Sequence, residues 1–171
     1  LAHMNHRGPD AQNWLLHDGH YFGHNRLSII DLNSRSDQPF VKDKYSIIFN
    51  GEVYNYKELI KDHRLIVETK SDTEVILEMY RKYGNECLKY FNGMFTIVIY
   101  NTSTKSVFIA RDRLGIKPLY IRLTGDMIEV ASEISALLAL REEQIDDFGV
   151  RQYKKLRMTI HGSTLYDNIK I

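Results

Sequence analysis

The sequence contains one cysteine, no long apolar run and no block of a single charge sign. One cysteine cannot form an internal disulfide, and the apolar runs are far shorter than the roughly 20 residues of a membrane-spanning helix. The formal net charge of +1 is not gathered in a basic stripe, which argues against nucleic acid or a membrane surface as a partner. The opening residues, LAHMNH, are too polar for a signal peptide. We therefore expect a soluble, cytoplasmic domain that binds neither nucleic acid nor membrane.

The length and composition are those of one ordinary globular domain. The 171 residues are 43% hydrophobic and 26% charged, close to globular averages, and suffice to bury a core. The sequence has no internal repeat and no glycine-rich loop of the kinds that hold phosphate groups or ATP. We expect no cofactor within this domain.

Hydrophobic periodicity in the first half of the chain predicts a hairpin, a strand and two helices. These are a hairpin of residues 13–16 and 21–22, a strand of residues 45–49, a helix of residues 56–62 and a helix that begins at residue 71 and ends at Gly84. Asn55 and Ser71 are expected to cap the two helices, and Glu74 to close a capping box with Ser71. Residues 1–13 resemble the end of a helix that runs into a loop at Gly8-Pro9.

In the second half, the period changes from that of a helix to that of strands. Four strands are expected, at residues 94–100, 106–110, 119–123 and 127–131, and the turn residues within each pair predict an antiparallel meander. A helix opens at Ser132 and Glu133 and continues through Leu140. Residues 141–171 are charged and irregular, which is typical of a boundary or linker. Strands in a run, with the helices apart from them, indicate an α+β fold.

The dipeptide Asn50-Gly51 does not fit a simple hairpin. It is the commonest signal for a tight hairpin turn, but no second strand follows it. A side-chain amide, together with the N–H of a residue that has no Cβ, is the pair of donors of which an oxyanion hole is made. Glu52 places a carboxylate directly beside them.

Two further polar residues allow either a binding role or an ordinary structural one. Arg26 precedes the apolar run Leu27–Ile30, where a strand end would hold a guanidinium at a pocket floor to grip a carboxylate. The alternative is an ordinary surface arginine. Asp72 lies in the first turn of a helix, where compensation of the helix dipole explains it well. Taken alone, neither residue shows whether its role is in binding or in structure.

Histidine and cysteine are also considered as functional groups. His17, His20 and His24 are close in sequence, but Asp18-Gly19 between them is a turn, and no second ligand cluster completes a metal shell. We interpret the three histidines as exposed loop residues and predict no metal site. Cys87 lies among apolar residues with no histidine beside it, which favours a buried, inert thiol over a nucleophile.

Taken together, several stretches match a known family. They are HRGPDAQ, GHNRLSIIDL, QPF, FNGEVYNYKEL, SDTEVILEMYRKYG, FNGMFTIVIYN, ARDRLGIKPLY and ASEISALL, and they run from about His6 to Leu138. In order and spacing they resemble class II glutamine amidotransferase domains, above all the amino-terminal domain of glutamine-hydrolysing asparagine synthetases. The resemblance implies the fold of the N-terminal-nucleophile hydrolases, a four-layer αββα sandwich in which two antiparallel sheets stack between helical layers.

The resemblance also implies a role for each matching position. In that family, glutamine is held by its amino-acid end while its side-chain amide is hydrolysed. Arg26 would bind the α-carboxylate, and Glu52 and Asp72 would bind the α-ammonium group. The backbone from Leu27 to Ile30 would line the pocket. Asn50 and Gly51 would stabilise the oxyanion. One cation and two anions suit the charges of a zwitterion.

The family's nucleophile is missing from its expected position. It is a cysteine at the mature amino terminus, whose own amine serves as the base, whereas residue 1 here is Leu and Cys87 lies elsewhere. We expect the sequence to be a fragment or an incomplete chain without glutaminase activity of its own. The alternative is that the domain has lost its nucleophile.

The leading hypothesis is the glutaminase domain of an asparagine-synthetase-like amidotransferase. Residues 1–140 would be the amidotransferase domain, and residues 141–171 a linker toward an absent C-terminal synthetase domain. That second domain would use ATP and Mg²⁺ to amidate aspartate or a related carboxylate. The alternatives are a non-catalytic glutamine-binding or regulatory module, and an amidotransferase of the same class with another ammonia acceptor. The expected partners are L-glutamine and the synthetase domain, and a homodimer is left open.

Overall fold

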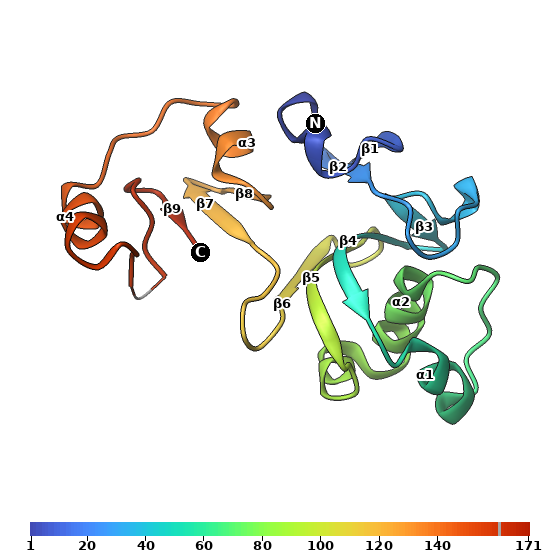
Figure 1. Ribbon diagram of the computed structural model, residues 1–171. Helices are drawn as coiled ribbons and strands as arrows, with labels where there is room; N and C mark the ends of the chain where they lie inside the picture. The colour runs from blue at the N-terminus through green and yellow to red at the C-terminus, as the bar shows by residue number, and fades with distance from the viewer. Residues whose placement is uncertain (161) are drawn as a thin grey trace. The chain divides into compact units, whose positions relative to one another are not determined.

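Residues Leu1–Lys117 form the first of two units in the computed structural model, which describes residues 1–160 and 162–171 (Figure 1). The elements of this unit are the 3₁₀ helix η1 (Ala2–Arg7), β1 (Ala11–His17), β2 (His20–Arg26), the 3₁₀ helix η2 (Ser34–Ser36), β3 (Phe40–Lys42), β4 (Tyr45–Val53), α1 (Tyr56–His63), α2 (Asp72–Tyr83), the 3₁₀ helix η3 (Gly84–Lys89), β5 (Gly93–Asn101) and β6 (Ser106–Arg111). Strands β1 and β2 form one antiparallel sheet, and the other has the order β3-β4-β5-β6.

The predicted hairpin of β1 and β2 is confirmed. His17 pairs with His20, and Asp18 and Gly19 between them have φ angles of 49° and 83°. Two successive residues with positive φ give the turn the twist that the flanking strands need. Residues before the hairpin form the 3₁₀ helix η1 and then a short extended segment through Gly8-Pro9.

The four-stranded sheet has a different neighbour on each face, because side chains alternate along a strand. Ile47 and Ile97 belong to the face that packs on α2, where Ile76 is also fully buried. On the opposite face the Tyr100 ring lies 5.6 Å from the ring of Phe22 in the β1–β2 hairpin. Helices, sheet and hairpin therefore form successive layers of this unit, and the predicted α+β class is confirmed.

Strand β4 does not end at Phe49, as the sequence predicted, but continues through Asn50-Gly51 to Val53. The reason is strand β5, which pairs along the whole segment, from Tyr45 opposite Asn101 to Val53 opposite Gly93. Asn50-Gly51 therefore makes no hairpin turn and lies within an extended strand.

The two helices of this unit begin and end close to their predicted positions, but their caps differ in part. Ser71 caps α2 as predicted, with its side chain accepting a hydrogen bond of 3.2 Å from Thr73 N. The capping box with Glu74 is wrong, because the Glu74 carboxylate accepts from Thr69 N (2.7 Å) and pairs with Lys42 (2.6 Å). Asn55 does not cap α1 with its side chain, which instead bonds the backbone of residues 90 and 92.

The four predicted strands of the second half exist, but the single meander is wrong. Strands β5 and β6 join the sheet that contains β4, whereas the next pair joins another sheet. The loop between the two pairs is organised by Asp112, whose carboxylate accepts from the N–H groups of Phe95 (3.2 Å), Ile116 (2.9 Å) and Lys117 (3.0 Å). This buried carboxylate ends the ladder of the first sheet and fixes the loop up to Lys117.

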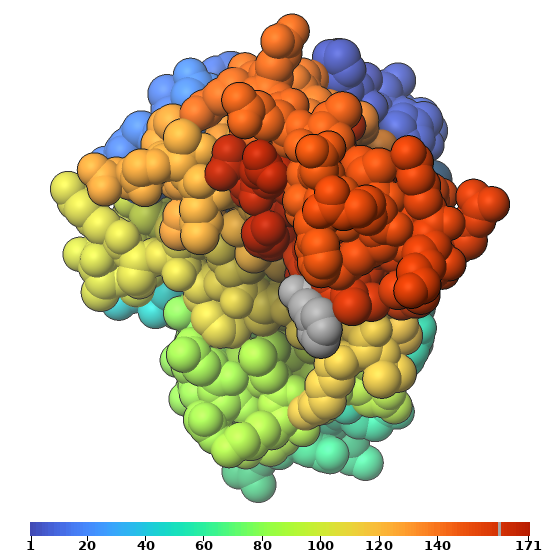
Figure 2. Space-filling view, turned by 90° about the vertical axis from the view of Figure 1, so that its left-hand side faces the viewer, coloured from blue at the N-terminus to red at the C-terminus, as the bar shows by residue number. Residues whose placement is uncertain are grey.

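The second unit, Pro118–Ile171, has a smaller antiparallel sheet and two helices. Its elements are β7 (Tyr120–Thr124), β8 (Met127–Ala131), α3 (Ile134–Leu138), α4 (Asp147–Leu156) and β9 (Ile169–Lys170), with the strand order β8-β7-β9. The expectation that residues 141–171 are irregular is wrong, since they contain α4 and β9. Asp146 caps α4 by accepting from Phe148 N (2.8 Å), and most of this helix lies on the surface (Figure 2).

A buried arginine binds the start of residues 141–171 to the rest of the second unit. Arg122 is fully buried and forms ion pairs with Glu129 (2.6 Å) and Glu143 (3.2 Å). Residue 143 is thus part of the packed unit, while the predicted role of 141–171 as a route to a further domain stays a prediction. Among the described residues, no helix has the length and apolar character needed to cross a bilayer.

Candidate active site

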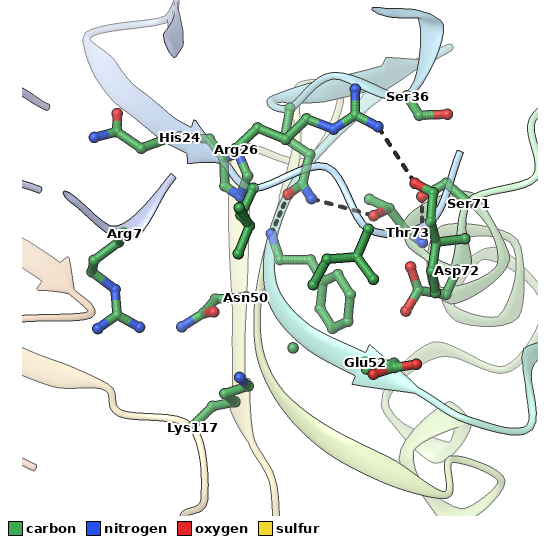
Figure 3. A pocket seen from close by; sticks show the side chains of 17 residues that line it. Arg7, His24, Arg26, Ser36, Asn50, Glu52, Ser71, Asp72, Thr73 and Lys117 are labelled. Carbon is green, nitrogen blue, oxygen red and sulfur yellow. Dashed lines mark hydrogen bonds between the residues drawn. The ribbon is translucent and has the colours of Figure 1, made fainter. Parts of the chain in front are cut away.

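One cavity of about 280 Å³ in the first unit brings together every residue predicted for the site (Figure 3). Its lining includes Arg26, Leu27, Ile30, Asn50, Gly51, Glu52 and Asp72. These residues come from the end of β2, the following loop, the last half of β4 and the start of α2. The volume is near the lower end of the range of about 300–1,000 Å³ for small-molecule sites, so it suits a ligand of amino-acid size.

The N–H of Gly51 points away from β5 and toward the cavity. Hydrogen-bonding groups alternate between the two edges of a strand. Phe49 and Val53, two residues to either side of Gly51, both donate away from β5, to Gln38 Oε1 (2.6 Å) and Asp72 Oδ2 (3.0 Å). Phe95, opposite Gly51, turns its own backbone toward Asp112. Gly51 therefore presents its N–H at the edge of β4 that lines the cavity.

Glycine is required at position 51 by its surroundings. Its φ of +155° is rare for other residues, and a Cβ there would lie 2.1 Å from the carbonyl oxygen of Met94. Gly93 has the same relation to β4, because a Cβ on it would lie 2.2 Å from the carbonyl oxygen of Glu52. The two glycines let β4 and β5 approach closely at the point where Asn50 and Gly51 face the cavity.

Arg26 is buried, and its guanidinium already contacts the loop that follows β2. Nη1 donates to Asp37 Oδ1 (2.5 Å) and Asn33 O (3.1 Å), and Nη2 donates to the carbonyl oxygens of Asp31 and, at 3.5 Å, Ile30. Arg26 therefore shapes the backbone that lines the cavity. Its predicted binding of a carboxylate stays a prediction, and the long bond to Ile30 is the contact that a ligand would most readily replace.

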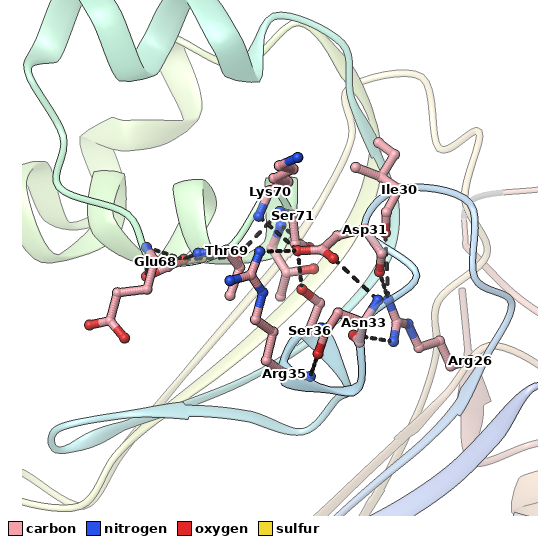
Figure 4. Close-up of polar contacts among 12 residues, drawn as sticks. Arg26, Ile30, Asp31, Asn33, Arg35, Ser36, Glu68, Thr69, Lys70 and Ser71 are labelled. Carbon is pink, nitrogen blue, oxygen red and sulfur yellow. Dashed lines mark hydrogen bonds and ion pairs between the residues drawn. The ribbon is translucent and has the colours of Figure 1, made fainter.

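Asp31 fastens this loop to the segment that precedes α2 (Figure 4). Its side-chain Oδ2 accepts from Lys70 N (2.8 Å) and Ser36 Oγ (2.9 Å). The bond from the Lys70 N–H, with smaller contributions from Ser36, lowers the pKa of Asp31 to about 2. Its φ of 49° is one that Asp and Asn adopt more easily than most residues. The Arg26 loop and the start of α2 are thus held in one frame.

The carboxylates of Glu52 and Asp72 give one side of the cavity a negative charge, and Asn50 lies on the other side (Figure 3). Asp72 is 5% exposed, and burial raises its pKa to about 6, with a further contribution from the charge of Glu52. The hydrogen bond from Val53 N opposes this shift. A cation bound between the two carboxylates would relieve both the burial and the repulsion of their charges.

His24 is not an exposed loop residue, as the sequence suggested, but lies in β2 and lines the cavity. Burial lowers its pKa to about 4, so the imidazole is neutral near pH 7. His17 and His20 lie against the Tyr100 ring instead, with ring centroids 6.4 and 5.0 Å away. Within the described part of the chain, His, Cys, Asp and Glu residues form no cluster that could hold a metal ion.

Cys87 lies in the core, as expected. It is 1% exposed, and burial raises its pKa to about 12. A thiol that stays protonated and has no access to the cavity cannot act as its nucleophile.

Several residues that line the cavity were not predicted from the sequence. They are Arg7, Asn25, Ser36, Gln38, Phe49, Ser71, Thr73 and Lys117. Gln38 and Lys117 lie within stretches that matched the family, QPF and ARDRLGIKPLY, but residue type alone gave no reason to select them. Their position depends on contacts between residues far apart in the chain.

Comparison with known proteins agrees with this geometry. Residues 1–171 match the family described as a glutamine amidotransferase domain. The chain is 39% identical to asparagine synthetase [glutamine-hydrolyzing] 1 of Bacillus subtilis, over 96% of the chain and 27% of the relative. It is 40% identical to an asparagine synthetase [glutamine-hydrolyzing] of Zea mays, over 78% of the chain and 23% of the relative. Amidase chry2 of Gibberella zeae is 32% identical over 96% of the chain and 25% of its own length. The chain thus spans about a quarter of the length of these relatives.

Proposed function

The chain belongs to the glutamine amidotransferase domain family, and we propose that it is the glutaminase part of an asparagine-synthetase-like enzyme. The proposed reaction converts L-glutamine and water into L-glutamate and ammonia. The single observation that carries the proposal is the cavity, which is lined by the oxyanion donors Asn50 and Gly51 and by the acidic pair Glu52 and Asp72, with the Asn50 side chain on the side opposite the two carboxylates.

The cavity can orient glutamine by charge. The α-ammonium group would lie between Glu52 and Asp72, and the α-carboxylate would bind Arg26 in exchange for part of its contact with the loop. The side-chain amide would then extend toward Asn50 and Gly51. An amino acid with these three groups fits the Arg26 guanidinium, the two carboxylates and the two neutral donors, and Arg7 and Lys117 add further positive charge to the cavity lining.

Asn50 and Gly51 would act when charge develops on the amide oxygen. A thiolate attacks the amide carbon, and the carbonyl oxygen becomes an oxyanion that accepts from the Asn50 side-chain amide and the Gly51 N–H. Collapse of this intermediate releases ammonia after the nitrogen gains a proton and leaves a thioester. Water then hydrolyses the thioester to glutamate and restores the thiol. We propose that this thiol belongs to an amino-terminal cysteine of the intact protein, because Cys87 is buried away from the cavity.

The ammonia would be consumed by a second domain. Two relatives are named as glutamine-hydrolysing asparagine synthetases, and this name supports a synthetase domain that amidates aspartate or a related carboxylate. The alternative is an amidotransferase of the same class with another ammonia acceptor. The proposed location is the cytoplasm. The use of ATP and Mg²⁺ in the synthetase domain stays a prediction, and a homodimer is left open.

The experiment uses the intact protein and a glutamine analogue that carries an electrophile in place of the amide. We expect glutamine hydrolysis and covalent labelling of the amino-terminal cysteine. Asn50→Ala should lower kcat by about 10²–10³-fold, whereas Asn101→Ala, a control at the far end of β5, should not. Glutamine binding without labelling or hydrolysis would favour the non-catalytic module, and no binding at all would refute the proposal.

A further inference from the structure

The Gln38 side chain accepts a backbone hydrogen bond from β4 at a point beyond the end of β3. Strand β3 begins with Phe40, which pairs with Ile47, and Gln38 lies two residues before this first pair. The Gln38 side chain accepts the Phe49 N–H with Oε1 at 2.6 Å, and the residue is 7% exposed. The Gln38 side-chain amide thus supplies a hydrogen bond to β4 just beyond the first backbone pair of the β3–β4 ladder.

The same amide also reaches the start of α2. Its Nε2 donates to Thr73 Oγ1 at 3.3 Å. Thr73 follows Asp72, whose carboxylate accepts from Val53 N at 3.0 Å. The edge of β4 is therefore attached to the start of α2 at two points, one on each side of Gly51.

These two attachments matter because of the residue between them. Glycine has the greatest backbone freedom of all residues, and Gly51 has a φ of +155°. An oxyanion donor acts only when it lies about 2.7–3.1 Å from the developing charge, and its effect depends on being fixed before the reaction. Fixing the N–H groups of Phe49 and Val53 fixes the direction of the Gly51 N–H.

We propose that Gln38 is a positioning residue for the reaction: it aligns the Gly51 N–H as an oxyanion donor and ties it to the start of the helix that carries Asp72. This inference rests on the proposed function of the cavity. Gln38 contacts neither reacting atom in this account, and it acts through Phe49. Its loss should therefore weaken stabilisation of the transition state more than binding of glutamine.

The test compares three variants of the intact protein in steady-state glutamine hydrolysis. Gln38→Met keeps the size of the side chain but leaves the Phe49 N–H without an acceptor, and it should lower kcat by about 10- to 100-fold, less than loss of a donor itself. KM for glutamine should change by less than about threefold. Gln38→Glu keeps an acceptor for Phe49 and can accept from the Thr73 hydroxyl, so it should restore most of kcat. Gln152→Met is the matched control, because Gln152 is another buried glutamine that accepts a backbone N–H, from Ile160 at 3.3 Å, in the second unit.

An inhibitor pair separates positioning from a purely structural role. The aldehyde analogue of glutamine forms a tetrahedral adduct with a thiolate, whereas glutamate binds without such an adduct. Gln38→Met should weaken inhibition by the aldehyde about as much as it lowers kcat, and should leave inhibition by glutamate unchanged. Unchanged kcat in Gln38→Met, equal losses in Gln152→Met, or equal weakening of both inhibitors would overturn the proposal. If the unaltered protein neither hydrolyses glutamine nor responds to the aldehyde, the proposed function itself fails.

Discussion

The carboxylate of Asp72 accepts a hydrogen bond of 3.0 Å from the N–H of Val53, which joins the first residue of α2 to the last residue of β4. The bond places a carboxylate that is 5% exposed beside the strand that presents Asn50 and Gly51. Burial raises the pKa of Asp72 to about 6, so holding this group ionised near pH 7 destabilises the fold. Its location in the cavity supports a role in ligand binding rather than in stability.

The first prediction concerns the stability of Asp72→Asn. A raised pKa means that the folded state binds the proton more tightly than the unfolded state, so this group lowers stability as pH rises from about 4 to 6. Asp72→Asn removes the effect and keeps an acceptor for Val53 N. Its free energy of unfolding should exceed that of the unaltered protein by up to about 3 kcal/mol at pH 8, and the difference should vanish near pH 4.

Urea denaturation across this pH range measures the difference. Asp147→Asn is the control, because Asp147 is also the first residue of a helix, α4, but is exposed. The control should show no such gain. An Asp72→Asn variant less stable than the unaltered protein at pH 8 would contradict the role given to burial.

The second prediction concerns His24, whose ionisation makes stability fall as pH decreases rather than as pH increases. Burial lowers the pKa of His24 to about 4, so the unfolded state binds its proton more tightly, and stability is lost as pH falls from about 6.5 to 4. His24→Gln should therefore lose less stability on acidification than the unaltered protein, by about 2–3 kcal/mol between pH 7.5 and pH 4.5. Denaturation at these two pH values tests this. The exposed His20, changed to Gln, should leave the acid dependence as it is.

The third prediction concerns the close approach of β4 and β5. Gly51→Ala would bring a Cβ to 2.1 Å from Met94 O, a backbone atom that cannot yield without moving β5. Gly125 also has a positive φ, of +55°, but a Cβ there has no atom within 4 Å. Gly51→Ala should destabilise the protein by more than the roughly 1–2 kcal/mol of φ strain expected for Gly125→Ala. Thermal denaturation of the two variants compares them, and equal losses would show that the approach is not tight.

The fourth prediction separates the two contributions of Asp31, its φ of 49° and its bond to Lys70 N. Asp31→Asn keeps both, Asp31→Gly keeps the φ only, and Asp31→Ala keeps neither. Affinity for glutamine should fall in that order. Each step weakens the attachment of the loop that contacts Arg26 to the segment before α2. Calorimetric titration measures the affinity in proteins whose proposed amino-terminal cysteine is changed to Ala, which prevents hydrolysis, with Asp43→Ala as a control at an exposed residue of φ 52°. Equal affinities of the three variants would show that Asp31 does not organise the cavity.

Residue type and local pattern predicted most elements and the members of the site. The apolar run before Asn50, rich in isoleucine and aromatic residues, predicted a strand, and the missing second strand argued against a hairpin turn. The failures share a cause, which is contact between distant residues. Glu74 has the sequence position of a capping box, but the Lys42 ammonium and the loop N–H groups bind its carboxylate instead. Periodicity marked the strand pairs correctly but carried no information on the sheet that each pair joins.

The same limit applied to the site. Asn50 and Gly51 were found because their chemistry is evident from two adjacent residues. Gln38 was not, because its role depends on the register between β3 and β4, which brings its amide opposite Phe49. His24 was misjudged because a turn sequence precedes it, while the packing of the hairpin on β4 places it in the cavity wall.

The most direct test of the central claim is calorimetric titration of the intact protein and its Asp72→Asn variant, both with the proposed amino-terminal cysteine changed to Ala so that glutamine is bound but not hydrolysed. The ligands are L-glutamine and glutaramate, which is glutamine without the α-ammonium group. The unaltered protein should bind glutamine at least tenfold more tightly than glutaramate, and Asp72→Asn should lose this preference although it is the more stable protein at pH 8. Equal binding of both ligands by the unaltered protein, or full retention of the preference in Asp72→Asn, would contradict the account.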